Sequence, residues 1–572
     1  MIFGVKTDAG TTLIMGLKDV ASKSAEDEFE TFKKNVEEIG ERFKKTNSQK
    51  AKEIFAAISG LMSDRAATEK KFGSMLEGYV NEIAPLVRET STSELEEEDL
   101  TAVIKLNRYF CGYHSLAHFA DKAVSSGLAA EKEILGEEGA PILNPSFKQK
   151  NESAAARLVR TLSKAISRGG DEKSGIHAKA KTFLSPMLKE RYNLNVIPIK
   201  NYLGSRFNIL FSNAAYIYVM RKELTELFET YDTNQLLLSV KKDIQNKVIL
   251  SGVQTLAMIH KTVIGPLTRA LDRKENGIIE MNAIYKSLVD YLDRAAADPS
   301  ILLQGSSPFA EEYLTRDQVW EEIFRPNPEL AVTTRTIAAS TMKSFAVFAR
   351  KEFSDHIEGG AHHNISETAA KAGQTHNMVL ERGLGQYDNK KRRVPGMSSA
   401  AVETAVLVSQ NHTLSWLMNK PQDERDSMIR ECQQQTPLMM VKNKENAQQL
   451  QKVLESRQQQ LQQEKSAKEQ READERSILV KKVQDTGGLW QSNHQMSESL
   501  VHIPSKKLRL EAIKAQLCYR KKILRQAGGQ VKDFSFSENG RQLSEEELKS
   551  KVASLMTNAN NPVEPDDDRM SE

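Results

Sequence analysis

The sequence predicts an α/β chain in which helices make up most of the structure. Two short apolar runs, Ile2 to Lys6 and Thr11 to Leu17, flank the turn-forming residues Asp8-Ala9-Gly10, a pattern typical of a β-hairpin. From Ser24 onward, apolar residues recur every three or four positions, which indicates amphipathic helices. A hairpin followed by a long helical region is therefore the expected fold class.

Composition and charge exclude several classes of protein. With 572 residues, 39% of them hydrophobic and 27% charged, the chain can bury a sizeable core and is not wholly disordered. Its 80 Lys and Arg residues balance 77 Asp and Glu residues, so nucleic-acid binding would depend on local basic patches. Three distant cysteines predict neither a disulfide framework nor a zinc ribbon. Without a signal-like start or a run of about 18 apolar residues, we expect an intracellular, non-secreted protein with no membrane span.

The first 125 residues mix strand and helix signals. Ser24 and Asp27 are spaced like a capping box, and the helix that they begin carries its apolar residues on one face. The apolar stretch from Ile54 to Met62 fits a helix, a strand or both, because periodicity does not distinguish them over so short a run. Phe72, Met75, Leu76 and Tyr79 predict another helix.

The later segments differ in composition. Residues 144–175 are polar, basic and rich in glycine, which predicts a linker or an exposed excursion, whereas residues 176–350 predict a helical block with Pro and Gly breaks. From 447 to 483 the chain is rich in Gln, Glu, Lys and Arg, with Leu454 and Leu461 one heptad apart. This short seam predicts a solvated or weakly coiled helix. A basic helix and an acidic, disordered tail follow.

Four short motifs stand in a fixed order along the chain. They are Ser63-Asp64-Arg65-Ala66, Phe110-Cys111-Gly112-Tyr113-His114, Ser205-Arg206-Phe207-Asn208, and His376-Asn377 followed by Leu380-Glu381-Arg382. Together they resemble the transposases of the hAT superfamily and related elements of animal genomes. The resemblance extends over roughly residues 10–420 and continues through Gln410-Asn411-His412-Thr413 to Trp416.

This resemblance implies a ribonuclease-H-like core in which three carboxylates hold two Mg²⁺ (or Mn²⁺) ions for DNA strand transfer. Two such ions, about 4 Å apart, need several converging carboxylate oxygens. The expected domains are 1–125 as the first part of the core, 126–364 as a helical insertion, and 365–435 as the second part of the core. A charged helix or short coiled coil (436–485), a basic helical segment (486–545) and an acidic tail (546–572) follow.

Carried over position by position, Asp64 would be the second acid and Glu381 the third, and both would be metal ligands. Asp64 is equally well explained as a helix N-cap, and Glu381 alone fits a solvated helix residue. Cys111 and His114 would match the Cys-x-x-His pair that supports the core. They do not complete a tetrahedral zinc site, and core packing is the simpler interpretation.

Arg206 and Phe207 would match the family's Arg-Trp pair, with Phe in place of Trp. The first acid has no clear counterpart. Only two strand-like runs precede the first helix, and Asp8 lies in the turn between them. If this hairpin is the second and third strand of the core, the first strand and its acid are missing and the site is incomplete. If the hairpin is instead the first and second strand, Asp8 could face Asp64.

Two basic segments could contact phosphates. Lys390-Lys391-Arg392-Arg393 could be a nuclear-import signal, a phosphate contact or a solvated loop. The second segment forms a helix with one apolar face, which could contact DNA or lie solvated in a coiled-coil cap. Its basic residues are Lys506, Lys507, Arg509, Lys514, Arg520, Lys521, Lys522 and Arg525.

No phosphate-binding glycine motif and no nucleophile-elbow setting competes with this interpretation. The sequence therefore predicts a nuclear, transposase-derived protein that acts on nucleic acid and has a catalytically incomplete core. DNA and a second copy, bound through the C-terminal helices, are the expected partners, with no small-molecule substrate. The alternative is a non-catalytic helical or coiled-coil interaction protein.

Overall fold

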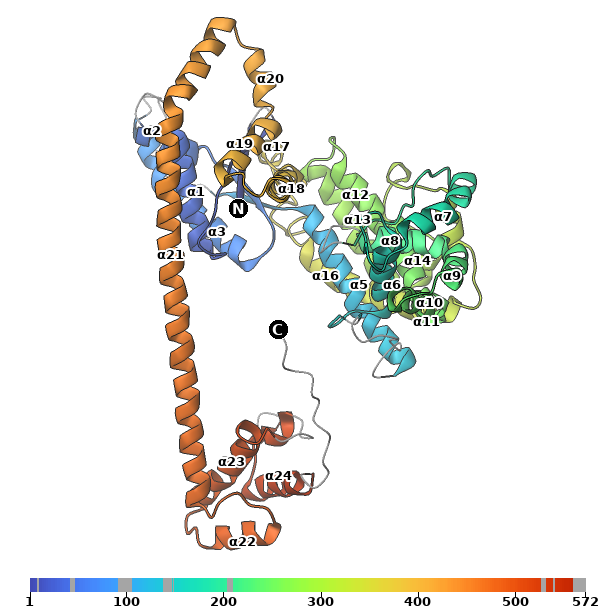
Figure 1. Cartoon of the computed structure of the whole chain (residues 1–572), viewed down its shortest axis with the longest axis vertical. Coiled ribbons are helices and arrows are strands. Elements are labelled where there is room, and N and C mark those ends of the chain that lie inside the picture. The colour runs from blue at the N-terminus through green and yellow to red at the C-terminus, as the bar shows by residue number, and fades with distance from the viewer. Residues whose placement is uncertain are drawn as a thin grey trace. The chain divides into compact units, whose positions relative to one another are not determined.

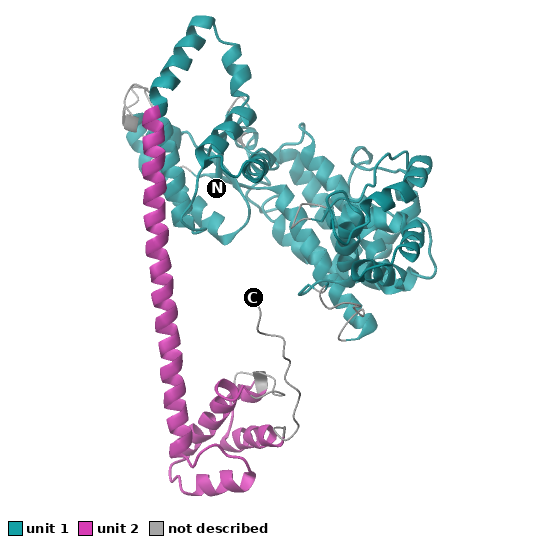
Figure 2. Cartoon of the chain, viewed as in Figure 1, with its two compact units in different colours: residues 1–436 teal, residues 437–572 magenta. Residues whose placement is uncertain are grey.

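The computed structural model describes residues 1–7, 10–41, 47–90, 105–136, 147, 149–202, 209–525, 531–538 and 541–558. Helices account for 71% of the structure, in agreement with the mostly helical class expected from the sequence. The chain divides into two compact units, Met1–Thr436 and Pro437–Glu572 (Figures 1 and 2).

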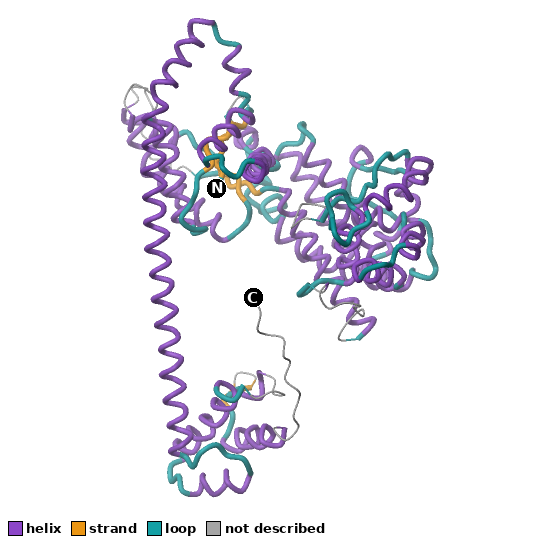
Figure 3. The backbone as a smooth tube through the Cα atoms, in the orientation of Figure 1, coloured by secondary structure: helices purple, strands orange, loops and turns teal. Residues whose placement is uncertain are grey.

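Short strands occur near the start of the first unit (Figure 3). Strands β1 (Ile2–Lys6) and β2 (Thr12–Leu17) form an antiparallel hairpin with a bulge between Phe3 and Gly4. This confirms the predicted hairpin, although Asp8 and Ala9 lie outside the described residues. Strands β3 (Gly60–Ser63) and β4 (Asn107–Phe110) form a separate parallel pair.

Three helices pack on one face of these strands. They are α1 (Ala25–Gly40), α2 (Asn47–Ala56) and α3 (Ala67–Thr90). The Ser24 side chain accepts a hydrogen bond from the Asp27 N–H, so the predicted cap begins α1. Phe3 of β1 and Phe32 of α1 lie 5.3 Å apart between ring centroids, within a cluster that also includes Leu61 of β3. The ambiguous stretch from Ile54 to Met62 contains the end of a helix and then a strand.

A large helical block follows β4 and contains the main core of the first unit. Helix α11 packs against α8 and α16, and α16 packs against α5 and α13. The elements of this block are α5 (Gly112–Leu135), α6 (Ala154–Ile166), α7 (His177–Tyr192), α8 (Ile209–Val219), α9 (Arg221–Thr230), α10 (Gln235–Gln245), α11 (Lys247–Ile259), η2 (His260–Ile264), α12 (Gly265–Asp272), α13 (Ile278–Ala297), α14 (Ser300–Leu303), η3 (Glu311–Tyr313), α15 (Gln318–Phe324) and α16 (Ala331–Glu352).

Helix α6 corrects the expectation that residues 144–175 form a linker. Its small residues Ala154, Ala155 and Ala156 are buried, as are Leu158 and Leu162. Small side chains allow neighbouring helices to approach closely, and Leu158 and Leu162, four positions apart, add larger apolar side chains to the buried part of the helix. Polarity was therefore a poor guide to exposure in this segment.

One helical stretch, Lys247–Asp272, is long and apolar enough to cross a membrane by composition alone. In the fold, 83% of its most apolar window is buried. It contains a π-helical turn, His260–Ile264, between α11 and α12. Burial among the surrounding helices explains its apolar character, as in the core helix of a large helical domain.

After the helical block, the chain returns to the strands. Helices α17 (Glu367–Ala372), α18 (Met378–Arg393), α19 (Ser399–Gln410) and α20 (Thr413–Met418) form this segment. The Lys6 ammonium donates to the carbonyl oxygens of Lys371 and Gly373, at 2.7 Å each. Leu380 and Val406 contribute to an apolar cluster with Ile14 of the hairpin. Residues 371–406 thus contact the N-terminal hairpin, although more than 350 residues separate them in the sequence.

The second unit combines a long helix with a small folded end. Helix α21 (Gln422–Asp485) begins in the first unit, and only Val483 of its 64 residues is buried, in agreement with a solvated charged helix. The remaining elements are α22 (Asn493–Val501), α23 (Lys506–Lys522), η4 (Val531–Phe534), β5 (Ser537–Glu538), β6 (Arg541–Gln542) and α24 (Glu545–Asn558).

Trp490 is fully buried in the core of this folded end. Helix α24 supplies Leu548, Val552 and Leu555 to the same core, although the sequence suggests a disordered tail from residue 546. Its apolar residues recur at helical spacing and pack against α23. The prediction of a disordered tail from residue 546 is therefore wrong up to Asn558, where α24 ends. Residues 559–572 lie outside the described residues.

Candidate functional site

Two of the motif residues lie side by side at the carboxyl ends of the parallel strands. Ser63 pairs with Phe110 in the β3–β4 register, and the Cys111 N–H donates to the Ser63 carbonyl oxygen at 3.0 Å. Asp64 and Cys111, which come next in each strand, are therefore neighbours. The carboxyl ends of parallel strands are where α/β folds place functional side chains.

Asp64 makes a tight turn before α3 (Ala67–Thr90) and is not its N-cap, because its carboxylate does not bond to an N–H of the helix. Its Oδ1 accepts a hydrogen bond from the Ala66 N–H at 2.8 Å, just before α3 begins. Two carboxylates lie near Asp64, because Asp64 contributes to raising the pKa values of Glu28 and Glu69. Burial is the larger cause for both, and together these effects raise the pKa of Glu69 to about 7. Repulsion between these groups favours a nearby positive charge.

Glu381 lies in the first turn of α18, where a carboxylate is favourable to the helix dipole. Neighbouring Leu380 packs in the hairpin cluster, and a Cβ on Gly383 would lie 2.7 Å from Ile2 Cδ1, so the hairpin fixes the rotation of the helix. Glu381 lies close enough to Cys111 to contribute to raising the pKa of that thiol, for which burial is the main cause. The second and third candidate acids thus each neighbour Cys111.

These residues do not fit a two-metal centre. In the described part of the chain, no three His, Cys, Asp or Glu side chains form a group that could hold a metal ion. Asp64 lies among Glu28 and Glu69, whereas the neighbour found for Glu381 is Cys111. A Mg²⁺ or Mn²⁺ pair needs several converging carboxylate oxygens, and this arrangement does not supply them. Asp8 lies outside the described residues.

Cys111 and His114 occupy the junction between β4 and α5. Cys111 is 2% exposed and belongs to the main core, and His114 is half-buried in the first turn of the helix. A Cβ on Gly112 would clash with Leu271, so the chain must pass closely at this point. Cys111 therefore packs in the core, whereas the His114 side chain is only half-buried. Arg206 and Phe207 lie outside the described residues.

The three cysteines are expected to differ strongly in reactivity. Burial raises the pKa of the Cys111 thiol, whereas Cys432 is exposed. Because the thiolate is the reacting species and the buried thiol needs an opening of the fold, Cys111 should react with iodoacetamide roughly a hundredfold or more slowly than Cys432. Peptide mass spectrometry over a time course at pH 8 measures both rates. Equal rates in the folded chain, with Cys432→Ser as control, would contradict this placement of Cys111.

The basic helix α23 offers fewer free charges than its sequence suggests. Arg520 is 3% exposed and donates to the Trp490 carbonyl oxygen, so burial prevents it from contacting a phosphate. Arg509 bonds to Glu545 at 2.9 Å, and Lys522 bonds to Glu475 at 2.8 Å. Lys514 is half-buried with its ammonium over the Phe536 ring. Four of the eight basic residues in this segment are exposed and form no ion pair with another described residue. They are Lys506, Lys507, Lys521 and Arg525.

The other basic run lies on a helix rather than in the loop that the sequence allows. Lys390, Lys391, Arg392 and Arg393 form the last turn of α18, the helix that carries Glu381. Arg392 pairs with Asp388 at 2.9 Å, and Lys391 donates to the Met397 carbonyl oxygen. Arg392 and Arg393 are exposed. Cations at this end also interact favourably with the helix dipole.

A buried polar network in the helical block has no signal in the sequence. Arg157 of α6 forms two hydrogen bonds to Asp243 of α10, at 2.9 and 2.8 Å, with both side chains almost fully buried. Glu131 of α5 accepts the Ala154 and Ala155 N–H groups and so caps α6. The pair is distant in sequence, and no motif connects its members.

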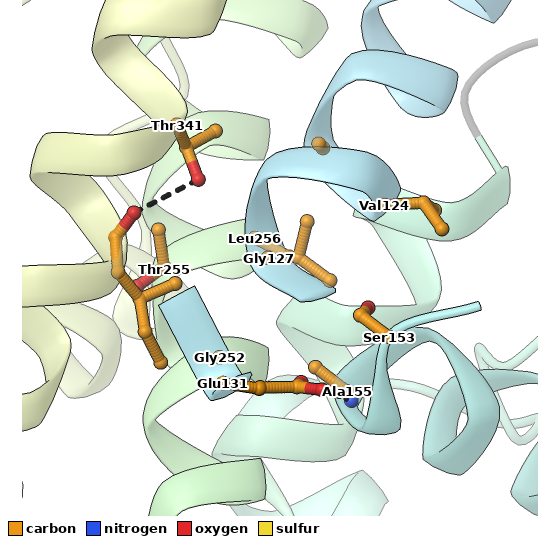
Figure 4. A pocket seen from close by; sticks show the side chains of 11 residues that line it. Val124, Gly127, Glu131, Ser153, Ala155, Gly252, Thr255, Leu256 and Thr341 are labelled. Carbon is orange, nitrogen blue, oxygen red and sulfur yellow. Dashed lines mark hydrogen bonds between the residues drawn. The ribbon is translucent and has the colours of Figure 1, made fainter. Parts of the chain in front are cut away.

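A small internal cavity lies beside this network, between α5, α6, α11 and α16 (Figure 4). Glu131, Ser153 and Thr341 are polar residues on its wall, and Gly127 and Gly252 make room for it. The Glu131 oxygens are used by backbone N–H groups, and Thr341 donates to the Ile337 carbonyl oxygen at 2.9 Å. The polar groups of the wall are therefore occupied by structural contacts.

Comparisons with known proteins found no match, either to a protein-family model, to a curated protein or to a solved structure.

Proposed function

We propose that this chain is a transposase-derived DNA-binding protein whose ribonuclease-H-like core does not cleave DNA. The observation that carries the proposal is the position of the candidate acids. Asp64 follows β3, and Glu381 lies on α18 near Cys111, which follows the paired strand β4. This position supports descent from a catalytic core. The described residues contain no group of three possible metal ligands, which argues against a working metal centre.

DNA contact in this proposal is electrostatic. Arg392 and Arg393 extend the exposed basic end of α18, and Lys506, Lys507, Lys521 and Arg525 are available on or next to α23. Such scattered lysines and arginines neutralise phosphates without reading bases. Binding should therefore be insensitive to DNA sequence and strongly dependent on salt. A nuclear location belongs to the same proposal.

Salt titration tests this binding. We expect the affinity for a labelled 25-base-pair duplex, measured by fluorescence anisotropy, to fall by about 0.9 log units per contacted phosphate for each tenfold rise in salt. Arg392→Gln with Arg393→Gln should reduce that slope by about 2 if each contacts one phosphate. Lys247→Gln with Lys286→Gln removes two exposed charges from the helical block and should leave the slope unchanged. Equal effects of both variants would contradict the assignment.

The same purified chain tests the lack of cleavage. Incubated with supercoiled plasmid and Mg²⁺, it should give no nicking above that of Asp64→Ala. Mg²⁺-dependent nicking that Asp64→Ala and Glu381→Ala both abolish would overturn the non-cleaving part of the proposal and leave the DNA-binding part intact.

The alternative function is that of a helical interaction protein, and helix α21 favours it. This helix exposes Leu454 and Leu461, 44% and 58% respectively, one heptad apart. Their seam continues with Lys468, so it is too short for a stable zipper of its own. Failure of the chain to bind DNA even at low salt would favour this alternative.

A further inference from the structure

Residues 164–200, from the end of α6 through α7, carry a strong excess of positive charge. The segment contains eight lysines and arginines against three acidic residues, whereas residues 209–300 contain eleven of each. Its basic residues are Lys164, Arg168, Lys173, Lys179, Lys181, Lys189, Arg191 and Lys200. Because the formal net charge of the whole chain is only +3, this excess is local to one part of the helical block.

Most of these positive charges have no acidic partner. Lys164 pairs with Asp171 at 3.3 Å, and Arg191 pairs with Glu223. The other six basic side chains are exposed and form no ion pair with another described residue. They are Arg168, Lys173, Lys179, Lys181, Lys189 and Lys200. We call these six residues the basic face.

The fold brings the two ends of the segment together. The Asn201 side-chain amide donates to the Gly169 carbonyl oxygen, which places Lys200 beside Arg168. The His177 ring bonds to the last carbonyl oxygen of α6 at 2.7 Å, so α7 begins next to the end of α6. Figure 1 shows both helices within the helical block. The loop between α6 and α7, the start of α7 and the chain before α8 therefore form one continuous surface.

Helix α7 adds three lysines to this surface. Its buried residues Ala180, Leu184 and Leu188 define the side that packs on the block. Lys179 and Lys189, ten residues apart, span about 15 Å along the helix axis. The Lys179 ammonium lies 4.8 Å from the centroid of the Tyr231 ring, a contact that leaves its charge unpaired. Lysines on the exposed side of α7 thus extend the basic loop along the helix.

Charge, rather than apolar area, distinguishes the basic face. The remaining acids of the segment, Glu172 and Glu190, are exposed and offset only part of the charge. Phe183 and Val196 are exposed, 39% and 65% respectively, but single apolar residues are normal on a protein surface. A protein partner is usually held by a cluster of aromatic or apolar anchors. An array of unpaired cations instead creates a positive potential that suits a polyanion with closely spaced charges.

We propose that the basic face is a DNA contact of the helical block, which holds the phosphate backbone of a duplex without reading its bases. This inference rests on the proposed function and adds a second contact to the basic end of α18. The 15 Å span of the α7 lysines corresponds to about four base pairs of duplex, at about 3.4 Å for each base pair. Each cation of the face would neutralise one phosphate, and the release of counterions would supply the binding free energy.

A charge-removal variant of the full chain tests the proposal. Arg168→Gln with Lys173→Gln and Lys200→Gln removes three cations from the loop end of the basic face and breaks no ion pair. We expect the affinity for a labelled 25-base-pair duplex to fall about tenfold or more at about 0.15 M salt. The slope of log affinity against log salt should fall by about 2 to 3.

The matched control removes the same charge from other exposed positions of the helical block. It is Lys247→Gln with Lys286→Gln and Lys351→Gln, and it should leave both the affinity and the slope unchanged. Circular dichroism and thermal unfolding check that both variants fold like the native chain.

Acetylation of the native chain gives a second measurement that needs no variant. A duplex on the basic face should slow acetylation of Lys181, Lys189 and Lys200 about fivefold or more, because each ammonium then contacts a phosphate. Lys247 and Lys286 should react at the same rate with and without DNA. Peptide mass spectrometry over a time course measures all five rates.

The outcomes separate this proposal from the proposed function. If the chain binds DNA but the lysines of the basic face stay unprotected, or if the charge-removal variant keeps the native slope, this proposal is overturned and the proposed function stands. Failure of the native chain to bind DNA at low salt would overturn both. Equal protection by polyglutamate of the same total charge would show a general preference for polyanions and overturn the assignment to DNA.

Discussion

Replacing Arg157 with Leu is expected to destabilise the first unit by about 3–5 kcal/mol. The guanidinium forms two hydrogen bonds to Asp243, and the side chains of the pair are only 5% and 3% exposed. Without Arg157, the Asp243 carboxylate stays buried and loses both hydrogen bonds from the guanidinium. Burial already raises the pKa of Asp243 although Arg157 lowers it, so the carboxyl should become protonated in the variant.

Urea-dependent hydrogen exchange of the α6 and α10 amides measures this loss within the first unit. Arg191→Leu is the matched control, because Arg191 pairs with Glu223 but is 59% exposed. That variant should cost less than about 1 kcal/mol. The double variant Arg157→Leu with Asp243→Leu should recover part of the stability, since an apolar pair avoids the buried charge. A loss at Arg157 no larger than that at Arg191 would show that the buried pair does not stabilise the fold.

The hairpin and the caps could be predicted because their signals are local. Asp8-Ala9-Gly10 between two apolar runs predicts β1 and β2, and Ser24 with Asp27 predicts the start of α1. The position of α24 could also be read from helical spacing, but the acidic composition that follows it obscured Leu548 and Val552. Turn and cap motifs therefore predict the positions of helices and strands well. Amino-acid composition predicts the boundaries of disordered segments less well.

The burial of α6 could not be predicted, because it depends on partners distant in sequence. Asp243 neutralises the charge of buried Arg157 through hydrogen bonds to its guanidinium. Glu131 of α5 accepts a backbone N–H at the start of α6 and so caps that helix. The candidate site shows the same limit. The order of the motifs predicts that Asp64 and Glu381 belong to one region, but only the fold shows that Glu28 and Glu69 lie near Asp64 and that Arg520 is buried and so lost from the basic surface.

Acidification below about pH 6.5 is expected to destabilise the first unit through His356. This residue is 7% exposed, and burial is the main cause that lowers its pKa to about 3, with His362 and Arg65 adding to the effect. Its Nδ1 hydrogen-bonds to Asn282 Oδ1 at 2.7 Å, so the neutral ring donates there. Its ring packs 4.7 Å from that of Tyr285, leaving little room for hydration of a cation.

The sign of this effect follows from the two pKa values. An unfolded histidine titrates near pH 6.5, whereas folded His356 titrates near pH 3. Between these two pH values, His356 is protonated in the unfolded chain and neutral in the folded chain. Stability from this group is therefore complete above pH 6.5 and falls with decreasing pH, by up to about 1.4 kcal/mol per pH unit. At pH 4.5 the loss would approach about 3 kcal/mol for this histidine alone.

His356→Gln isolates this contribution, because Gln offers an amide N–H to Asn282 but does not titrate. We expect the variant to be less stable than the native chain at pH 7.5 and to lose less stability on going to pH 4.5, in urea unfolding followed by hydrogen exchange in α13 and α16. His363 is exposed on the same segment, so His363→Gln should keep the native pH slope. An unchanged slope in His356→Gln would mean that His356 titrates normally in the folded chain and that another buried group sets the acid limit.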